Sequence, residues 1–152
     1  MILIVGGTGA LGRATTEKLL AQNKSVRILT RTPAKAQALQ KAGAEVVRGD
    51  LRDQKSLTSA CQGVDMVLAS AHSIMGRGSE ASKYIDAQGH KWLIDAAKMA
   101  GVQHFVYVSA LGAAPNHPVP FFRIKYEMEQ YLRNSGLPFT ILRPTAFMES
   151  HA

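Results

Sequence analysis

Short runs of β-branched and other apolar residues alternate along the chain with segments in which apolar positions recur every three or four residues. The first pattern is typical of strands buried on both faces, and the second is typical of amphipathic helices. Strands and helices that alternate in this way form βαβ units, with parallel strands and helices on both faces of the sheet. Strands are predicted at residues 2–5, 25–30, 45–48, 66–69, 104–109 and 139–142, and helices at residues 11–22, 34–42, 54–61, 82–100 and 122–134.

Capping residues and glycines mark the ends of these helices. Asp53 is placed to cap the helix that follows it, and Pro33 stands in the first turn of another helix, where its missing N–H costs nothing. Glycines follow four of the five helices, at Gly43, Gly63, Gly101 and Gly136. The pattern predicts an α/β Rossmann fold, a doubly wound parallel sheet of six strands in the order 3-2-1-4-5-6.

The segment between the first strand and the first helix is rich in glycine. One glycine permits a sharp turn, a second lets the backbone approach a diphosphate, and a third lets the helix pack closely on the strand. The N–H groups and the positive end of the helix dipole then face the anion. Glycine alone is a weak signal, but a turn between a strand and a helix is the context that a dinucleotide site requires. The predicted phosphate-binding residues are Gly6, Gly7, Thr8, Gly9, Ala10, Leu11 and Gly12, with G-x-G-x-x-G at Gly7, Gly9 and Gly12.

The end of the second strand carries Thr30-Arg31, and this position distinguishes between two cofactors. Sites for NAD place Asp or Glu there, about 20 residues beyond the turn, to bind the ribose hydroxyls. Arg31 instead is placed to stack on the adenine and pair with a 2′-phosphate, and Lys35 adds a second charge one turn into the next helix. We therefore expect NADP(H) to be preferred over NAD(H). The alternative is that both side chains are solvated surface charges.

Two further loops at the same edge of the predicted sheet are candidates for contact with the cofactor. Gly49-Asp50-Leu51 follows the third strand, where the Asp50 carboxylate is placed to accept a hydrogen bond from the adenine amino group. The alternative for Asp50 is an Asx turn within the loop. Ala69-Ser70-Ala71 closes the fourth strand. Residues 71–80 then form a loop that is expected to border the ligand crevice or, alternatively, to be a plain surface connection.

Segments spread over the whole chain resemble the NmrA-like, atypical branch of the short-chain dehydrogenase/reductase superfamily. They are GGTGALG, the TR-x-x-x-K stretch from Thr30 to Lys35, GDL, Gln88-Gly89, AGVQHFVYVSALG, the lysine of FFRIKYEMEQYLRNSGLPFTILRP, and PTAF. The resemblance implies a nucleotide-binding Rossmann domain over residues 1–152. Members of that branch usually continue into a smaller C-terminal lobe that contacts the substrate, and we expect this lobe to be absent from the chain.

Classical members of the superfamily use a serine, a tyrosine and a lysine for hydride transfer, the last two spaced Y-x-x-x-K. The matching positions here are Ser109, Phe121 and Lys125. Phe121 has no hydroxyl and cannot donate a proton, which puts the usual reduction of a carbonyl in doubt. The resemblance implies that Lys125 binds the nicotinamide ribose, that Ser109 lies near the ring, and that Pro144, Thr145 and the two residues after them form a wall beside the carboxamide. Simpler alternatives are an exposed helical lysine at position 125 and a strand-end hydroxyl at position 109.

Composition narrows the choice of partners. The 152 residues carry a formal net charge of +7, which favours an anionic ligand. The basic residues are scattered without a basic run, so nucleic acid is not expected as the main ligand. No segment is apolar for long enough to span a membrane, and a cytoplasmic protein is expected. Cys61 is predicted to be a packed residue, the spacing of the five histidines predicts no metal site, and the fourth and fifth helices are a candidate oligomer contact.

Three functions remain compatible with these residues. The leading hypothesis is an NADP(H)-dependent oxidoreductase of the NmrA-like type that transfers a hydride to a quinone, a carbonyl or a similar small acceptor. A quinone can take its proton from water, so the missing tyrosine does not exclude this reaction. The second hypothesis is a non-catalytic NAD(P)(H)-sensing regulator or assembly factor, which Phe121 favours. A sugar-nucleotide epimerase or dehydratase comes third, because those enzymes also rely on the missing tyrosine.

Overall fold

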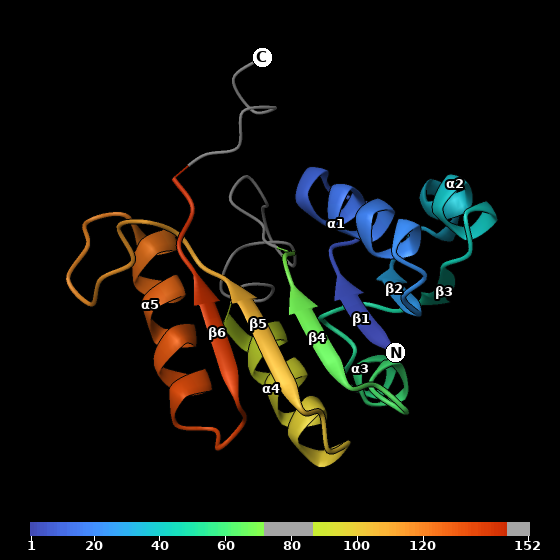
Figure 1. Ribbon diagram of the computed structural model, residues 1–152. Helices are drawn as coiled ribbons and strands as arrows, with labels where there is room; N and C mark the ends of the chain where they lie inside the picture. Colours follow the sequence, from blue (N-terminus) through green and yellow to red (C-terminus); the bar gives the residue numbers. More distant parts are fainter. Residues whose placement is uncertain (72–86, 146–152) are drawn as a thin grey trace.

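Six parallel strands form one sheet in the computed structural model, which describes residues 1–71 and 87–145 (Figure 1). The strands are β1 (Ile2–Val5), β2 (Val26–Thr30), β3 (Glu45–Arg48), β4 (Met66–Ala69), β5 (His104–Val108) and β6 (Phe139–Leu142). Their order across the sheet is β3-β2-β1-β4-β5-β6, and every neighbouring pair is parallel. The predicted Rossmann fold and its strand order are confirmed.

The helices that connect these strands are α1 (Ala10–Ala21), α2 (Gln37–Lys41), α3 (Gln54–Ala60), α4 (His90–Met99) and α5 (Pro120–Arg133), with a 3-10 helix η1 (Pro33–Ala36) before α2. The helix predicted over residues 34–42 therefore begins as a tighter turn, which is common at helix N-termini. The helix predicted from residue 122 begins two residues earlier, because Pro120 suits the first helical turn. Residues 82–86 of the predicted fourth helix lie outside the described residues.

Buried apolar side chains form two clusters on opposite faces of the sheet. Successive residues of a strand point to opposite faces, so Leu3 belongs to one cluster and Ile4 belongs to the other. The larger cluster includes side chains of α3, α4 and α5, and Figure 1 shows α4 behind the strands that it covers. The smaller cluster packs against α1 and α2, with Leu39 of α2 almost fully buried. Helices thus cover both faces, as in a doubly wound sheet.

The predicted helix ends agree with the structure in detail. The Asp53 side chain accepts hydrogen bonds from the backbone N–H groups of Lys55 and Ser56 and caps α3. The four glycines that were predicted to follow helices all have positive φ. Cys61 ends α3 as a buried, packed residue, and burial raises the pKa of its thiol to about 11. Within the described ranges, no helix has the length and apolar character needed to cross a membrane.

Candidate dinucleotide-binding site

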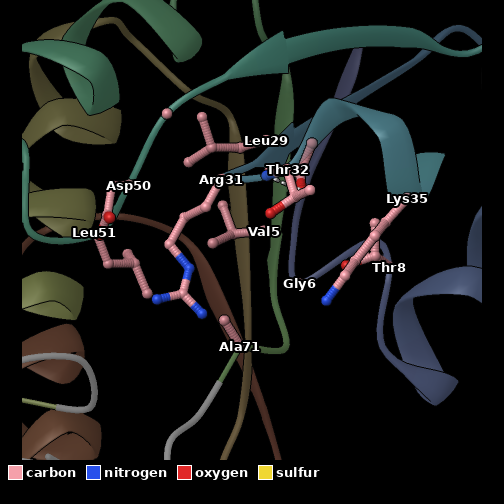
Figure 2. A pocket seen from close by; sticks show the side chains of 12 residues that line it. Val5, Gly6, Thr8, Leu29, Arg31, Thr32, Lys35, Asp50, Leu51 and Ala71 are labelled. Atoms are coloured by element: carbon pink, nitrogen blue, oxygen red, sulfur yellow. Dashed lines mark hydrogen bonds between the residues drawn. The ribbon is translucent and has the colours of Figure 1, made fainter. Parts of the chain in front are cut away.

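The loops that follow β1, β2, β3 and β4 come together at the edge of the sheet where these parallel strands end. They enclose a pocket of about 180 Å³, which Figure 2 shows from close by. Its lining residues are Val5, Gly6, Thr8, Leu29, Thr30, Arg31, Thr32, Lys35, Gly49, Asp50, Leu51 and Ala71. Residues predicted from four separate loops therefore share one cavity, at the edge where open parallel sheets bind their ligands.

The glycine turn allows α1 to approach β1 closely. Gly6 has a φ of +94°, and a Cβ there would lie 2.7 Å from the backbone nitrogen of Ala71. A Cβ at Gly12 would lie 2.0 Å from the Gly6 carbonyl oxygen and 2.7 Å from the Cα of Gly7. Both positions therefore exclude any side chain, and Gly12 has the packing role that was predicted for the third glycine.

The start of α1 has the features of an anion site. No side chain caps the helix, and its first turn contains no acidic residue. Gly9 is the N-cap residue, with an extended backbone (φ −77°, ψ 173°) that other residues adopt readily. A Cβ at Gly9 would be 3.5 Å from the Gly6 carbonyl oxygen, which is an ordinary van der Waals distance. The fold therefore does not require glycine at this position, whereas a diphosphate lying against the helix N-terminus does.

Basic side chains gather beside the β2 end of the pocket. Figure 2 shows the Arg31 side chain between Leu51 and Val5, and the Lys35 ammonium on the side where Thr8 lies. Arg13, the residue directly after Gly12 in α1, donates a hydrogen bond from Nη2 to the Lys35 carbonyl oxygen over 3.3 Å. Arg31 and Lys35 are exposed, yet both line the same cavity. Two cationic groups that line one cavity favour a ligand that carries phosphate.

The Asp50 loop forms the Asx turn that was predicted as the alternative to a ligand contact. The carboxylate accepts a hydrogen bond from the Arg52 backbone N–H over 2.8 Å, which is an Asx turn. It also forms an ion pair with the Arg52 guanidinium, with Nη2 and Oδ2 2.6 Å apart. The hydrogen bond from the Arg52 side chain holds the pKa of Asp50 below its ordinary value. A hydrogen bond from adenine to this carboxylate stays a prediction, and it would form beside the Arg52 side chain, which donates to both oxygens.

The loops after β4 and β6 are tied to neighbouring strands. Ser70 donates a hydrogen bond from its hydroxyl to the Val5 carbonyl oxygen over 3.0 Å, which joins the exit of β4 to the end of β1. Beyond β6, the Pro144 carbonyl oxygen accepts a hydrogen bond from the Leu111 N–H over 2.9 Å. Thr145 is the last described residue, so the final part of the predicted carboxamide wall lies outside the described residues, as do residues 72–80 of the predicted crevice loop.

Lys125 of α5 is buried against the end of β5. Its side chain is 1% exposed, so the alternative of an exposed helical lysine is wrong. Nζ donates a hydrogen bond to the Val108 carbonyl oxygen over 3.2 Å. The same nitrogen lies 5.0 Å from the ring centroid of Tyr107 and 5.5 Å from that of Phe121, both within the range of a cation–π contact. Phe121, which stands where classical relatives have tyrosine, thus packs against the lysine charge.

Ser109 is held by a buried carboxylate that the sequence did not single out. The hydroxyl lies 2.6 Å from Oε2 of Glu129, a residue with no exposed surface. Arg143 donates to the same carboxylate, from Nε over 3.0 Å and from Nη2 over 2.5 Å. The hydrogen bond with Glu129 raises the pKa of Arg143 above its ordinary value. Ser109 directly follows Val108, whose carbonyl binds Lys125, so both residues lie at the end of β5, whereas the pocket of Figure 2 lies around β1, β2 and β3.

Comparison with known proteins places these features in a family. Residues 6–152 match the family described as NAD(P)H-binding. The NAD(P)H azoreductase of Xenophilus azovorans is 36% identical over 150 residues, which are 99% of this chain and 49% of the azoreductase. The photosystem II assembly factor Ycf39 of Cyanophora paradoxa is also 36% identical, over 97% of this chain and 46% of that protein.

One solved structure has the same sequence identity to this chain as these two relatives. The crystal structure of the NADPH-dependent quinone oxidoreductase QOR2 of Escherichia coli, complexed with NADPH, superposes with a TM-score of 0.76 at 36% identity. The similarity covers 94% of this chain and 48% of that structure. The chain thus spans about half the length of the relatives that it matches.

Proposed function

The chain belongs to the NAD(P)H-binding family, and from this premise we propose that it binds NADP(H) in preference to NAD(H) and serves a reductase that transfers a hydride to a quinone or a similar small acceptor. The observation that carries the proposal is that Arg31 and Lys35 line the same pocket as the glycine turn. The azoreductase and the quinone oxidoreductase, whose sequences align with nearly the whole chain, support this reading.

The balance of charge around the pocket favours the phosphorylated cofactor. An acidic group beside the adenosine ribose would repel a 2′-phosphate, and β2 is followed by Arg31 instead. The acidic side chain that does line the pocket, Asp50, is paired with Arg52. The guanidinium of Arg31 and the ammonium of Lys35 therefore line the cavity beyond the end of β2, a stretch of sequence that contains no acidic residue. A dianionic phosphate gains charge-assisted hydrogen bonds there that a ribose hydroxyl does not.

Lys125 and Ser109 are the residues that we propose to bind the nicotinamide half of the cofactor. The order of the sheet puts β5 on the far side of β1 from the Arg31 pocket, with β4 between them. In folds of this type the dinucleotide lies across the edge, so its nicotinamide half extends toward β4 and β5. We propose that the Lys125 ammonium, which donates to the Val108 carbonyl, also holds the ribose of that half, with little loss of side-chain entropy because the side chain is already packed.

The missing tyrosine limits the chemistry but does not prevent hydride transfer to a quinone. A hydride carries two electrons and one hydrogen to the acceptor and leaves the oxidised nicotinamide and a hydroquinone monoanion. The monoanion then takes one proton from water and becomes the hydroquinone. No acidic side chain is needed at the instant of transfer, so Phe121 in place of tyrosine is compatible with this reaction.

The test is oxidation of NADPH, followed by its absorbance, with a panel of small quinones. Wild type should turn over at least one quinone, and Lys125→Met should lower kcat/KM by about tenfold or more because the ribose loses its anchor. Lys18→Met, which changes an exposed lysine of α1, is the matched control and should behave as wild type. Binding of NADPH without turnover of any acceptor would contradict the reductase proposal.

A non-catalytic role is the second candidate, and two observations favour it. Phe121 occupies the position of the usual proton donor, and the assembly factor Ycf39 aligns with the chain at the same identity as the azoreductase. We propose that in this case NADP(H) occupancy alters a surface that a partner protein reads. The quinone panel separates the two candidates, because the second predicts tight NADPH binding with no oxidation of the cofactor.

A further inference from the structure

Glu129 links three elements of the fold beneath the predicted nicotinamide position. It lies on α5, one helical turn after Lys125, and has no exposed surface. Its carboxylate contacts the hydroxyl of Ser109 at the end of β5 and the guanidinium of Arg143 just after β6. Its burial and these contacts fix its position, and it takes no part in the proposed hydride transfer.

The charges of the three groups determine which way the Ser109 proton points. The two carboxylate oxygens of Glu129 accept N–H groups from the Arg143 guanidinium, so the carboxylate acts as an acceptor on both sides. A serine hydroxyl has a single proton to donate. The contact of 2.6 Å between Ser109 Oγ and Glu129 Oε2 is therefore donated by Ser109. Only lone pairs of that hydroxyl remain for a ligand.

We propose that Glu129 is a positioning residue that makes Ser109 a hydrogen-bond acceptor toward the ligand, and that the site thereby selects hydride acceptors whose reduced form is a delocalised anion. Quinones belong to this class, whereas simple ketones and aldehydes do not. The proposal rests on the reductase function proposed above and narrows its range of substrates.

The difference between the two substrate classes lies in where negative charge develops. Hydride addition to a simple ketone produces a localised alkoxide, which needs a hydrogen-bond donor at its oxygen in the transition state. Phe121 has no donor, and the Ser109 proton is committed to Glu129. Lys125 donates to the Val108 carbonyl and is proposed above to hold the nicotinamide ribose, so it is not the donor to the acceptor oxygen. A quinone spreads the same charge over its ring and second oxygen, and water protonates the product afterwards.

The variant Glu129→Gln should reverse the direction of the hydrogen bond between this residue and Ser109, with almost no change of side-chain volume. Arg143 would hold the amide oxygen of the glutamine through Nη2, and the amide NH₂ would take the position of Oε2. The bond from Arg143 Nε is then lost, and the NH₂ donates to Ser109, whose own proton becomes available to a ligand. We expect the ratio of kcat/KM for a small aromatic ketone to that for a quinone to rise about tenfold, a modest part of what one oxyanion donor contributes. Ser109→Ala added to Glu129→Gln should remove that gain.

Ser109→Ala in the wild-type background supplies a comparison that does not depend on the buried glutamate. If Ser109 only accepts hydrogen bonds, the alanine variant should change ketone and quinone kcat/KM by the same factor within about threefold. If Ser109 donated to the substrate in the wild type, ketone turnover alone should fall by roughly a hundredfold. That selective loss, or a gain in Glu129→Gln that survives Ser109→Ala, would overturn the proposal.

A measurement without turnover tests the same point and separates it from the reductase function. Neutron diffraction from crystals of the wild-type protein in D₂O locates the deuterium of the Ser109 hydroxyl. We expect it between Ser109 and Glu129, and a deuterium directed away from Glu129 would refute the assigned polarity. If the deuterium lies where expected but no quinone is reduced, the reductase function fails, and with it the substrate selection, while the role of Glu129 in orienting Ser109 stands.

Discussion

Alanine substitutions at two glycines of the same turn should separate stability from cofactor binding. A Cβ at Gly12 would lie 2.0 Å from the Gly6 carbonyl oxygen, and because this neighbour is backbone, α1 would have to move away from the turn. The free energy of unfolding of Gly12→Ala should fall by about 3 kcal/mol or more, at the upper end of the cost of overpacking. A Cβ at Gly9 meets only that oxygen at 3.5 Å on an extended backbone. Gly9→Ala should therefore change the free energy of unfolding by less than about 0.5 kcal/mol.

The effect on the ligand should be large at the position where the effect on stability is small. The methyl group of Gly9→Ala projects into the space before the N-terminus of α1, where the diphosphate is expected to lie. Displacing the ligand should cost about 1–3 kcal/mol, which corresponds to a dissociation constant for NADPH that is roughly 5-fold to 150-fold weaker. Urea denaturation and calorimetry on the same samples give both quantities. If Gly9→Ala were as stable as wild type and bound NADPH equally tightly, the diphosphate would not contact this turn, and the reasoning would be refuted.

Three further changes test other parts of the description. Arg31→Ala should weaken NADPH binding by about tenfold to a hundredfold, which is the contribution of one charge-assisted hydrogen bond or of two weaker ones. The same variant should bind NADH as tightly as wild type does. Equal losses of affinity for the two nucleotides in fluorescence titrations would contradict the expected preference. Asp53→Ala removes the acceptor for the first N–H groups of α3 and should lower the free energy of unfolding in urea by about 1 kcal/mol, whereas Asp53→Asn, which still caps, should lose less. Burial raises the pKa of Cys61 in the folded state, so the stabilisation of its neutral thiol is complete below the ordinary pKa of 9.0 and is lost as the pH rises toward about 11. Wild type should therefore lose more stability over that pH interval than Cys61→Ala does, and identical pH profiles would show that the thiol is not desolvated.

Local sequence signals were sufficient wherever the structure depends on neighbours along the chain. The six apolar runs predicted the strands, because parallel strands buried on both faces need apolar side chains at successive positions. Asp53 was recognised as a cap because a cap acts on N–H groups two and three residues away. The close packing of Gly12 followed from its place between a strand and a helix. In each of these cases one turn of the chain, or the register of one strand, brings the interacting groups together.

Tertiary contacts explain what the sequence did not reveal. Lys125 and Glu129 are one helical turn apart, a spacing that alone indicated nothing about burial. Ser109 and Arg143 reach Glu129 from β5 and from the end of β6, 20 and 14 residues away in the chain. For Asp50, both a ligand contact and an Asx turn were open, because the choice depends on where the Arg52 side chain lies. Arg13 was overlooked for a similar reason, since its approach to Lys35 requires α1 and η1 to be neighbours.

The two faces of the sheet are packed unequally, and this difference bears on local opening of the native state. The cluster under α1 and α2 is the smaller one, and the short segment of η1 and α2 contributes only Leu39 to it, with Ala36 of η1 also buried. Amide groups of this segment should therefore exchange with solvent through sub-global fluctuations of lower free energy than those of β4 and β5. Arg31 precedes this segment and Lys35 lies within it, so an adenosine phosphate bound between them would slow amide exchange first at the least protected corner of the fold.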